Sequence, residues 1–136
     1  MGDDCDDDHH SHDQEGEACL TRPSGAPDAD AKGEVEIEKK GNGSEEFEIE
    51  VKNLAADLPI DIFLEDPANR GTFNNLGPFK TNAAGRFEIE YTTAGGLPFS
   101  TNIAGLVGLE VRVVEVGGST PLLVGVVPAL GDDCDD

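Results

Sequence analysis

The residues with the clearest chemical potential stand at the two ends of this sequence. Residues 2–7 read Gly-Asp-Asp-Cys-Asp-Asp, and residues 131–136 read Gly-Asp-Asp-Cys-Asp-Asp again. Carboxylates packed this closely suit a hard cation such as calcium, which takes roughly six to eight oxygen ligands in irregular geometry. A repeat of this length at opposite ends of one chain predicts that the two ends do the same job, or do one job together.

The candidate calcium ligands are the aspartates of both ends. They are Asp3, Asp4, Asp6, Asp7 and Asp8 near the start, and Asp132, Asp133, Asp135 and Asp136 at the end. Asp4, Asp6 and Asp8 alternate as ligands do in many calcium loops, but the glycine and the closing glutamate of an EF-hand loop are missing. The alternative is a solubilising acidic tail that binds no metal.

All the histidines of the chain lie beside the first acidic run. His9, His10 and His12 follow Cys5 closely. Imidazole and thiolate are ligands for zinc or copper rather than for calcium. Zinc or copper at this cluster is therefore an alternative cofactor.

Three cysteines, Cys5, Cys19 and Cys134, lie in the polar ends of the chain. Exposed cysteines of this kind predict disulfides and an extracellular or cell-surface location, although no signal peptide is visible after Met1. Their connectivity is open, and an odd number leaves one for a partner chain or free. A Cys5–Cys134 bond would either wrap the N-terminal arm along the domain or link molecules head to tail. A head-to-tail contact that does not close generates a filament.

Composition and missing motifs narrow the function classes. The net charge of −20 argues against nucleic acid or an anionic membrane as partner and favours cations or basic proteins. No apolar run is long enough to span a membrane. Nucleotide-binding loops, metalloprotease motifs and nucleophile elbows are absent from the sequence. We therefore expect that the chain is not an enzyme.

Alternation of apolar and charged residues places the folded part between the two ends. We expect an acidic arm over residues 1–31, a β-sandwich domain over 32–130 and an acidic tail over 131–136. The predicted strands cover residues 33–40, 46–52, 59–65, 77–81, 86–91, 109–116 and 121–128. Seven strands separated by turn residues, with no long helical stretch, predict an all-β antiparallel sandwich.

The strand segments also resemble a known family. The runs G-E-V-E-I-E, F-E-I-E-V-K-N-L, P-I-D-I-F-L-E-D, T-N-A-A-G-R-F-E-I-E-Y and G-L-E-V-R-V-V-E-V are similar to secreted bacterial β-sandwich domains, broadly immunoglobulin-like, found in cell-surface and matrix proteins. The resemblance covers residues 32–128 and leaves out both acidic ends. It implies a structural or adhesive module without catalysis.

Two functional hypotheses follow from these observations. The first is an extracellular self-assembling subunit, joined head to tail to copies of itself through the acidic ends by bridging calcium and disulfides. The second is a monomeric β-sandwich module that binds metal ions or another ligand. An enzyme that uses a pair of carboxylates is the least favoured reading, because alternating glutamates on strands usually form a solvated face.

Overall fold

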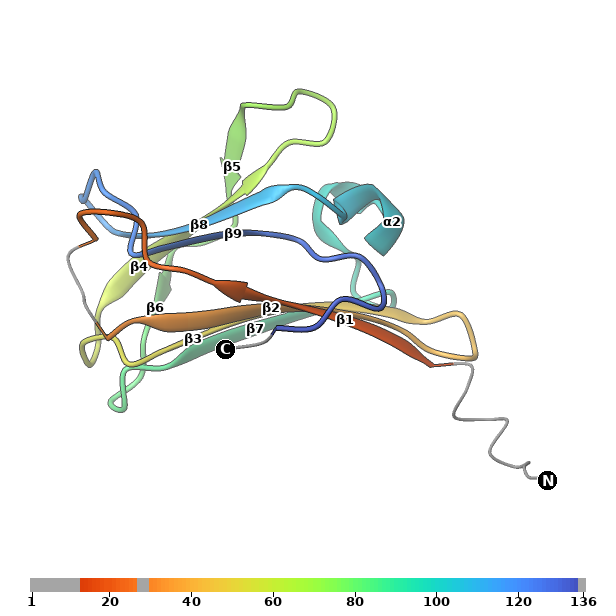
Figure 1. The fold of residues 1–136 in the computed structure, drawn as a ribbon, viewed down its shortest axis with the longest axis horizontal. Coiled ribbons are helices and arrows are strands. Elements are labelled where there is room, and N and C mark those ends of the chain that lie inside the picture. Colours follow the sequence, from red (N-terminus) through yellow and green to blue (C-terminus); the bar gives the residue numbers. More distant parts are fainter. Residues whose placement is uncertain (1–12, 27–29, 135–136) are drawn as a thin grey trace.

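The computed structural model describes residues 13–26 and 30–134, whose regular secondary structure is nearly all β (Figure 1). The nine strands of these ranges are β1 (Gln14–Leu20), β2 (Lys32–Lys39), β3 (Glu45–Lys52), β4 (Pro59–Glu65), β5 (Phe73–Asn75), β6 (Phe79–Lys80), β7 (Phe87–Thr92), β8 (Glu110–Glu115) and β9 (Leu123–Val126). A 3-10 turn, η1 (Pro98–Ser100), and one short helix, α2 (Ile103–Leu106), precede β8. Neither helical segment of these ranges has the length and apolar character needed to cross a bilayer.

The strands form two antiparallel sheets. The first sheet has the order β1-β2-β3-β7, and the second has the order β5-β4-β8-β9, with β6 paired to β4. A bridge between Thr21 and Val124 joins the end of β1 to β9, so the two sheets meet along this side of the molecule. The all-β antiparallel sandwich predicted from the sequence is confirmed.

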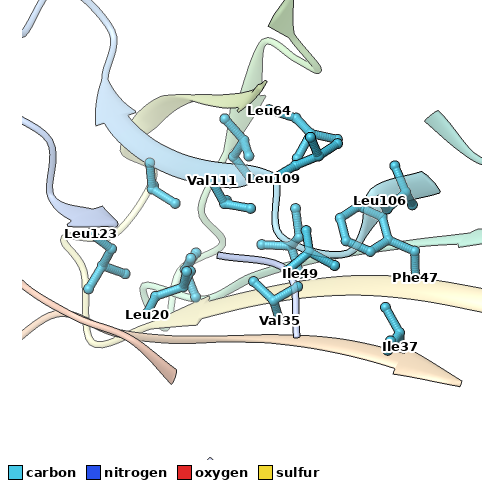
Figure 2. Close-up of a cluster of buried hydrophobic side chains, with 14 of the residues drawn as sticks. Leu20, Val35, Ile37, Phe47, Ile49, Leu64, Leu106, Leu109, Val111 and Leu123 are labelled. Atoms are coloured by element: carbon cyan, nitrogen blue, oxygen red, sulfur yellow. The ribbon is translucent and has the colours of Figure 1, made fainter. Parts of the chain in front are cut away.

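Alternation along the strands fills the space between the sheets. Phe47, Ile49 and Val51 of β3 point inward and are fully buried, and the side chains of β4 and β8 meet them from the second sheet (Figure 2). Leu106 of α2 closes one end of this core. Each such side chain contributes about 1.5–3 kcal/mol through burial, so the core supplies the main stabilisation of the fold.

The structure contains two strands that the sequence did not predict, β1 and β5. We expected residues 14–20 in the N-terminal arm, but they form β1 and bury Leu20 in the core. The apolar alternation fails at Gly16, where a Cβ atom would lie 2.2 Å from the carbonyl oxygen of Ala129. The close approach of the C-terminal backbone therefore requires glycine here, and that glycine hides the strand pattern.

Candidate functional site

The outer side of the first sheet carries most of the glutamates of the described residues. Strand register places ten glutamates of β1, β2, β3 and β7 on it: Glu15, Glu17, Glu34, Glu36, Glu38, Glu46, Glu48, Glu50, Glu88 and Glu90. We call this surface the carboxylate face. The alternation of these residues predicts a solvated strand face, and the structure shows how the four strands align them.

The glutamates are not merely near one another but directly opposite across neighbouring strands. Glu17 faces Glu36, Glu36 faces Glu48, and Glu48 faces Glu90, so one row crosses the whole sheet. Like charges placed directly opposite destabilise a sheet. The row therefore opposes folding at any pH at which all its members are ionised.

The crowding of glutamates along the row changes pKa values, and the change is clearest at Glu48. Hydrogen bonding with Glu88, burial and a further hydrogen bond with Glu36 raise the pKa of Glu48 to about 8. Burial raises the pKa of Glu36, and the negative charges of Glu15 and Glu17 raise it further. Glu48 therefore holds a proton near neutral pH, because ionising it together with its neighbours is unfavourable.

Three members of the carboxylate face approach one another closely enough to share a cation. One carboxylate oxygen from each of Glu15, Glu17 and Glu36 lies within 4.8 Å of the other two. All three side chains are at least partly exposed, so solvent can supply the remaining ligands. Carboxylate and water oxygens are the ligands that calcium takes.

The metal ligands predicted at the chain ends do not form part of this group in the described residues. Most of them lie outside the described residues: Asp3, Asp4, Asp6, Asp7, Asp8, His9, His10, His12, Asp135 and Asp136. Of the two that are described, Asp132 accepts a hydrogen bond from the Ala129 amide at 2.9 Å, and Asp133 is exposed. Neither belongs to the group formed by Glu15, Glu17 and Glu36, which sequence reasoning missed because the register of β1 was not visible.

A disulfide joins Cys19 of β1 to Cys134 at the end of the described chain. The bond lies within one molecule, so Cys134 is not available for the predicted Cys5–Cys134 bond; Cys5 itself lies outside the described residues. Backbone hydrogen bonds accompany the disulfide, because the Gly131 amide donates to Glu15 at 2.7 Å and the Glu17 amide donates to Asp132 at 2.8 Å. The beginning of the predicted acidic tail is therefore fastened along the edge of β1.

One acidic side chain of the second sheet has the opposite surroundings. Glu65, at the end of β4, is 8% exposed and accepts hydrogen bonds from the Gly71 amide at 2.8 Å and the Glu110 amide at 3.0 Å. Its carboxylate also pairs with Arg70 at 3.2 Å. The hydrogen bond from Arg70 and those from the two amides lower the pKa of Glu65 to about 2. These contacts give Glu65 a structural task, fastening the β4–β5 loop to β8.

Comparison with known proteins found no matching family model, no similar curated protein and no similar solved structure.

Proposed function

We propose that this chain is an extracellular, non-catalytic β-sandwich module that binds divalent cations, calcium first, on its carboxylate face. The observation that carries the proposal is the register that sets Glu17, Glu36 and Glu48 directly opposite one another. A cation between such carboxylates would remove a repulsion that the folded chain otherwise has to bear. The Cys19–Cys134 bond is compatible with an oxidising, extracellular location.

The strength of binding that we expect is modest. Three carboxylates that are at least partly exposed, together with several waters, form a weaker site than a loop that wraps the ion. Extracellular calcium modules work at about 10⁻⁴–10⁻³ M. Partial protonation of the face weakens binding further at low pH, because a proton and a cation compete for the same oxygens.

Thermal unfolding with and without calcium tests this proposal. At a calcium concentration of about ten times the dissociation constant, binding should add roughly 1.4 kcal/mol to the free energy of unfolding. Sodium chloride at matched ionic strength serves as the control, since screening alone also relieves repulsion. The double change Glu17→Gln and Glu36→Gln should abolish the stabilisation by calcium that exceeds the sodium chloride control.

A matched variant on the other sheet completes the test. Glu115 is exposed at the end of β8, so Glu115→Gln removes one negative charge without touching the carboxylate face. This variant should keep the full response to calcium. Equal responses from wild type, the double variant and the control variant would show that the face holds no calcium.

Self-assembly is our second proposal, and one structural observation favours it. The C-terminal Gly-Asp-Asp-Cys occupies a defined position on the edge of β1, and the chain carries the same four residues a second time at its start. The joint predicted through Cys134 needs revision, since Cys134 is bonded to Cys19. Zinc or copper binding at His9, His10 and His12 stays a separate prediction on residues outside the described ranges.

A further inference from the structure

The edge of β1 forms a seat for the segment Gly131–Cys134. Three contacts define the seat: the Gly131 amide donates to the Glu15 carbonyl, the Glu17 amide donates to the Asp132 carbonyl, and Cys134 is bonded to Cys19. The segment runs in the same direction as β1, because Gly131, Asp132 and Cys134 meet Glu15, Glu17 and Cys19 in that order. The two hydrogen bonds use only backbone atoms of the segment, and the third contact needs only a cysteine at its fourth position.

The first position of the seat selects for glycine. Gly131 has a φ of +97°, a left-handed conformation that is costly for residues with a Cβ atom. Residues 2–5 supply a glycine at this position and a cysteine at the fourth, in the same Gly-Asp-Asp-Cys order. The residue before each glycine is apolar too, since Leu130 packs against the core and Met1 precedes Gly2. Two further hydrogen bonds of the C-terminal segment lie within its own turn, between Asp132 and Ala129, and make no contact with β1.

We infer that residues 2–5 of a second copy of this chain can replace residues 131–134 in the seat on β1, with Cys5 taking the place of Cys134. This inference rests on the proposal of self-assembly and is independent of calcium binding. It names the joint between copies: the N-terminal Gly-Asp-Asp-Cys of one molecule lies along β1 of the next. Because the joint is head to tail, it can repeat without closing.

The covalent step is a thiol–disulfide exchange that needs no oxidant. The Cys5 thiol loses its proton to solvent, and the thiolate attacks the Cys19 sulfur. The Cys19–Cys134 bond breaks as the Cys5–Cys19 bond forms, and Cys134 leaves as a thiolate that takes up a proton. One disulfide and one thiol per chain remain after each step. Cys19 and Cys134 are both partly exposed, so a thiolate can approach the bond.

The seated segment runs parallel to β1, and this direction favours residues 2–5 of a second copy over residues 2–5 of the same chain. If Cys5 reached Cys19 of its own chain, residues 6–13 would have to run back along the whole of β1 to reach Gln14. That path would place Asp6, Asp7 and Asp8 beside the aspartates of the seated segment and beside Glu15 and Glu17. The N-terminal segment of another molecule can occupy the seat without its residues 6–13 running back along β1, so this repulsion does not arise.

An isotope-mixing experiment tests the inference. Equal amounts of ¹⁵N-labelled and unlabelled full-length chain are incubated without oxidant at mildly alkaline pH, with salt to screen repulsion, and are then quenched with acid. Covalent oligomers should appear on a non-reducing gel. Cleavage after glutamate separates Cys5 from Cys19, so mass spectrometry should find Cys5–Cys19 peptides with one labelled and one unlabelled half.

Matched variants separate the seat from simple cysteine reactivity. Gly2→Val keeps Cys5 but puts a β-branched residue where a left-handed φ is needed, so exchange should slow roughly tenfold. Ser11→Val lies outside the repeat and should exchange at the wild-type rate. Both variants should react equally with a small thiol reagent, and Cys5→Ser should form no covalent oligomer.

The outcomes divide cleanly. Mixed-isotope Cys5–Cys19 peptides that depend on Gly2 support the inference. It is overturned if Cys5–Cys19 peptides carry one isotope only, if Cys5 links to another Cys5, or if Gly2→Val exchanges as fast as wild type. Sedimentation of Cys5→Ser reports assembly without the covalent joint, so the failure of this joint is distinguishable from the failure of self-assembly itself.

Discussion

Glu48 and Glu65 are the same residue type on the two sheets of one sandwich, yet their pKa values move in opposite directions. Glu48 lies among other glutamates of the carboxylate face, and its pKa rises to about 8. Glu65 receives two backbone amides and Arg70, and its pKa falls to about 2. Both side chains extend from central strands of their sheets, so the difference comes from the neighbours and not from the strand.

The comparison shows what each sheet does with negative charge. In the second sheet the Glu65 carboxylate is surrounded by hydrogen-bond donors, so its negative charge stabilises the fold. The first sheet collects ten glutamates on one face, where Lys40 pairs with Glu46 and Arg86 pairs with Glu50 at its two ends. The first sheet is therefore the region where pH, salt and cations should act.

The largest effect that we expect comes from removing the bond at the edge of the first sheet. Cys19 and Cys134 are 115 residues apart, and a loop of this size predicts about 4–5 kcal/mol of stabilisation. The double change Cys19→Ser and Cys134→Ser should lower the free energy of urea unfolding by up to that amount. Hydrogen exchange should also speed up in β1 before it does in β4 or β8; equal acceleration in both sheets would contradict a local role for the bond.

The next effect concerns Glu65. Glu65→Ala leaves the amides of Gly71 and Glu110 without their acceptor, so it should destabilise the chain more than any single change on the carboxylate face. The folded pKa lies below the ordinary value of 4.5, so the stabilisation is present above about pH 4.5 and is lost as pH falls toward 2. The difference between wild type and variant should shrink over that window in urea unfolding. A constant difference would mean that packing, not charge, is lost.

The smallest effect has the opposite sign. The folded pKa of Glu48 is above its ordinary value, so this group favours folding at low pH and its contribution is lost as pH rises from about 4.5 to 8. Glu48→Gln should therefore raise the free energy of unfolding at pH 8 by up to about 1 kcal/mol, the size of a cross-strand pair. At pH 4 the gain should vanish. Glu115→Gln, on the other sheet, is the control and should show no such dependence.

Local alternation was enough to predict most of the sandwich from the sequence. The strand predicted over residues 59–65 coincides with β4. The strand predicted over 33–40 is shifted by one residue from β2, and the one over 46–52 begins one residue after β3 does. These strands have one apolar face and one charged face, so period two is visible in the residues themselves. The short β5 has no such pattern and was missed.

The parts that were missed depend on contacts between distant residues. β1 is a strand because β2 pairs with it and the C-terminal backbone packs on Gly16, and neither partner can be read from residues 14–20 alone. The same holds for the pairing of Cys19 with Cys134 and for the register that sets Glu17 opposite Glu36. Sequence predicted that glutamates would line a face; only the fold shows which of them meet.

The bond between Cys19 and Cys134 has a mechanical consequence. If force is applied to the chain before Cys19 and after Cys134, the disulfide carries that force. The strands β2 to β9 do not bear it, because they all lie inside the loop that the bond closes. Tension could strip residues 14–18 from β2, but it could not lengthen the enclosed chain. Reduction would release a slack of roughly 400 Å. In its oxidised form the domain is a short, nearly inextensible link.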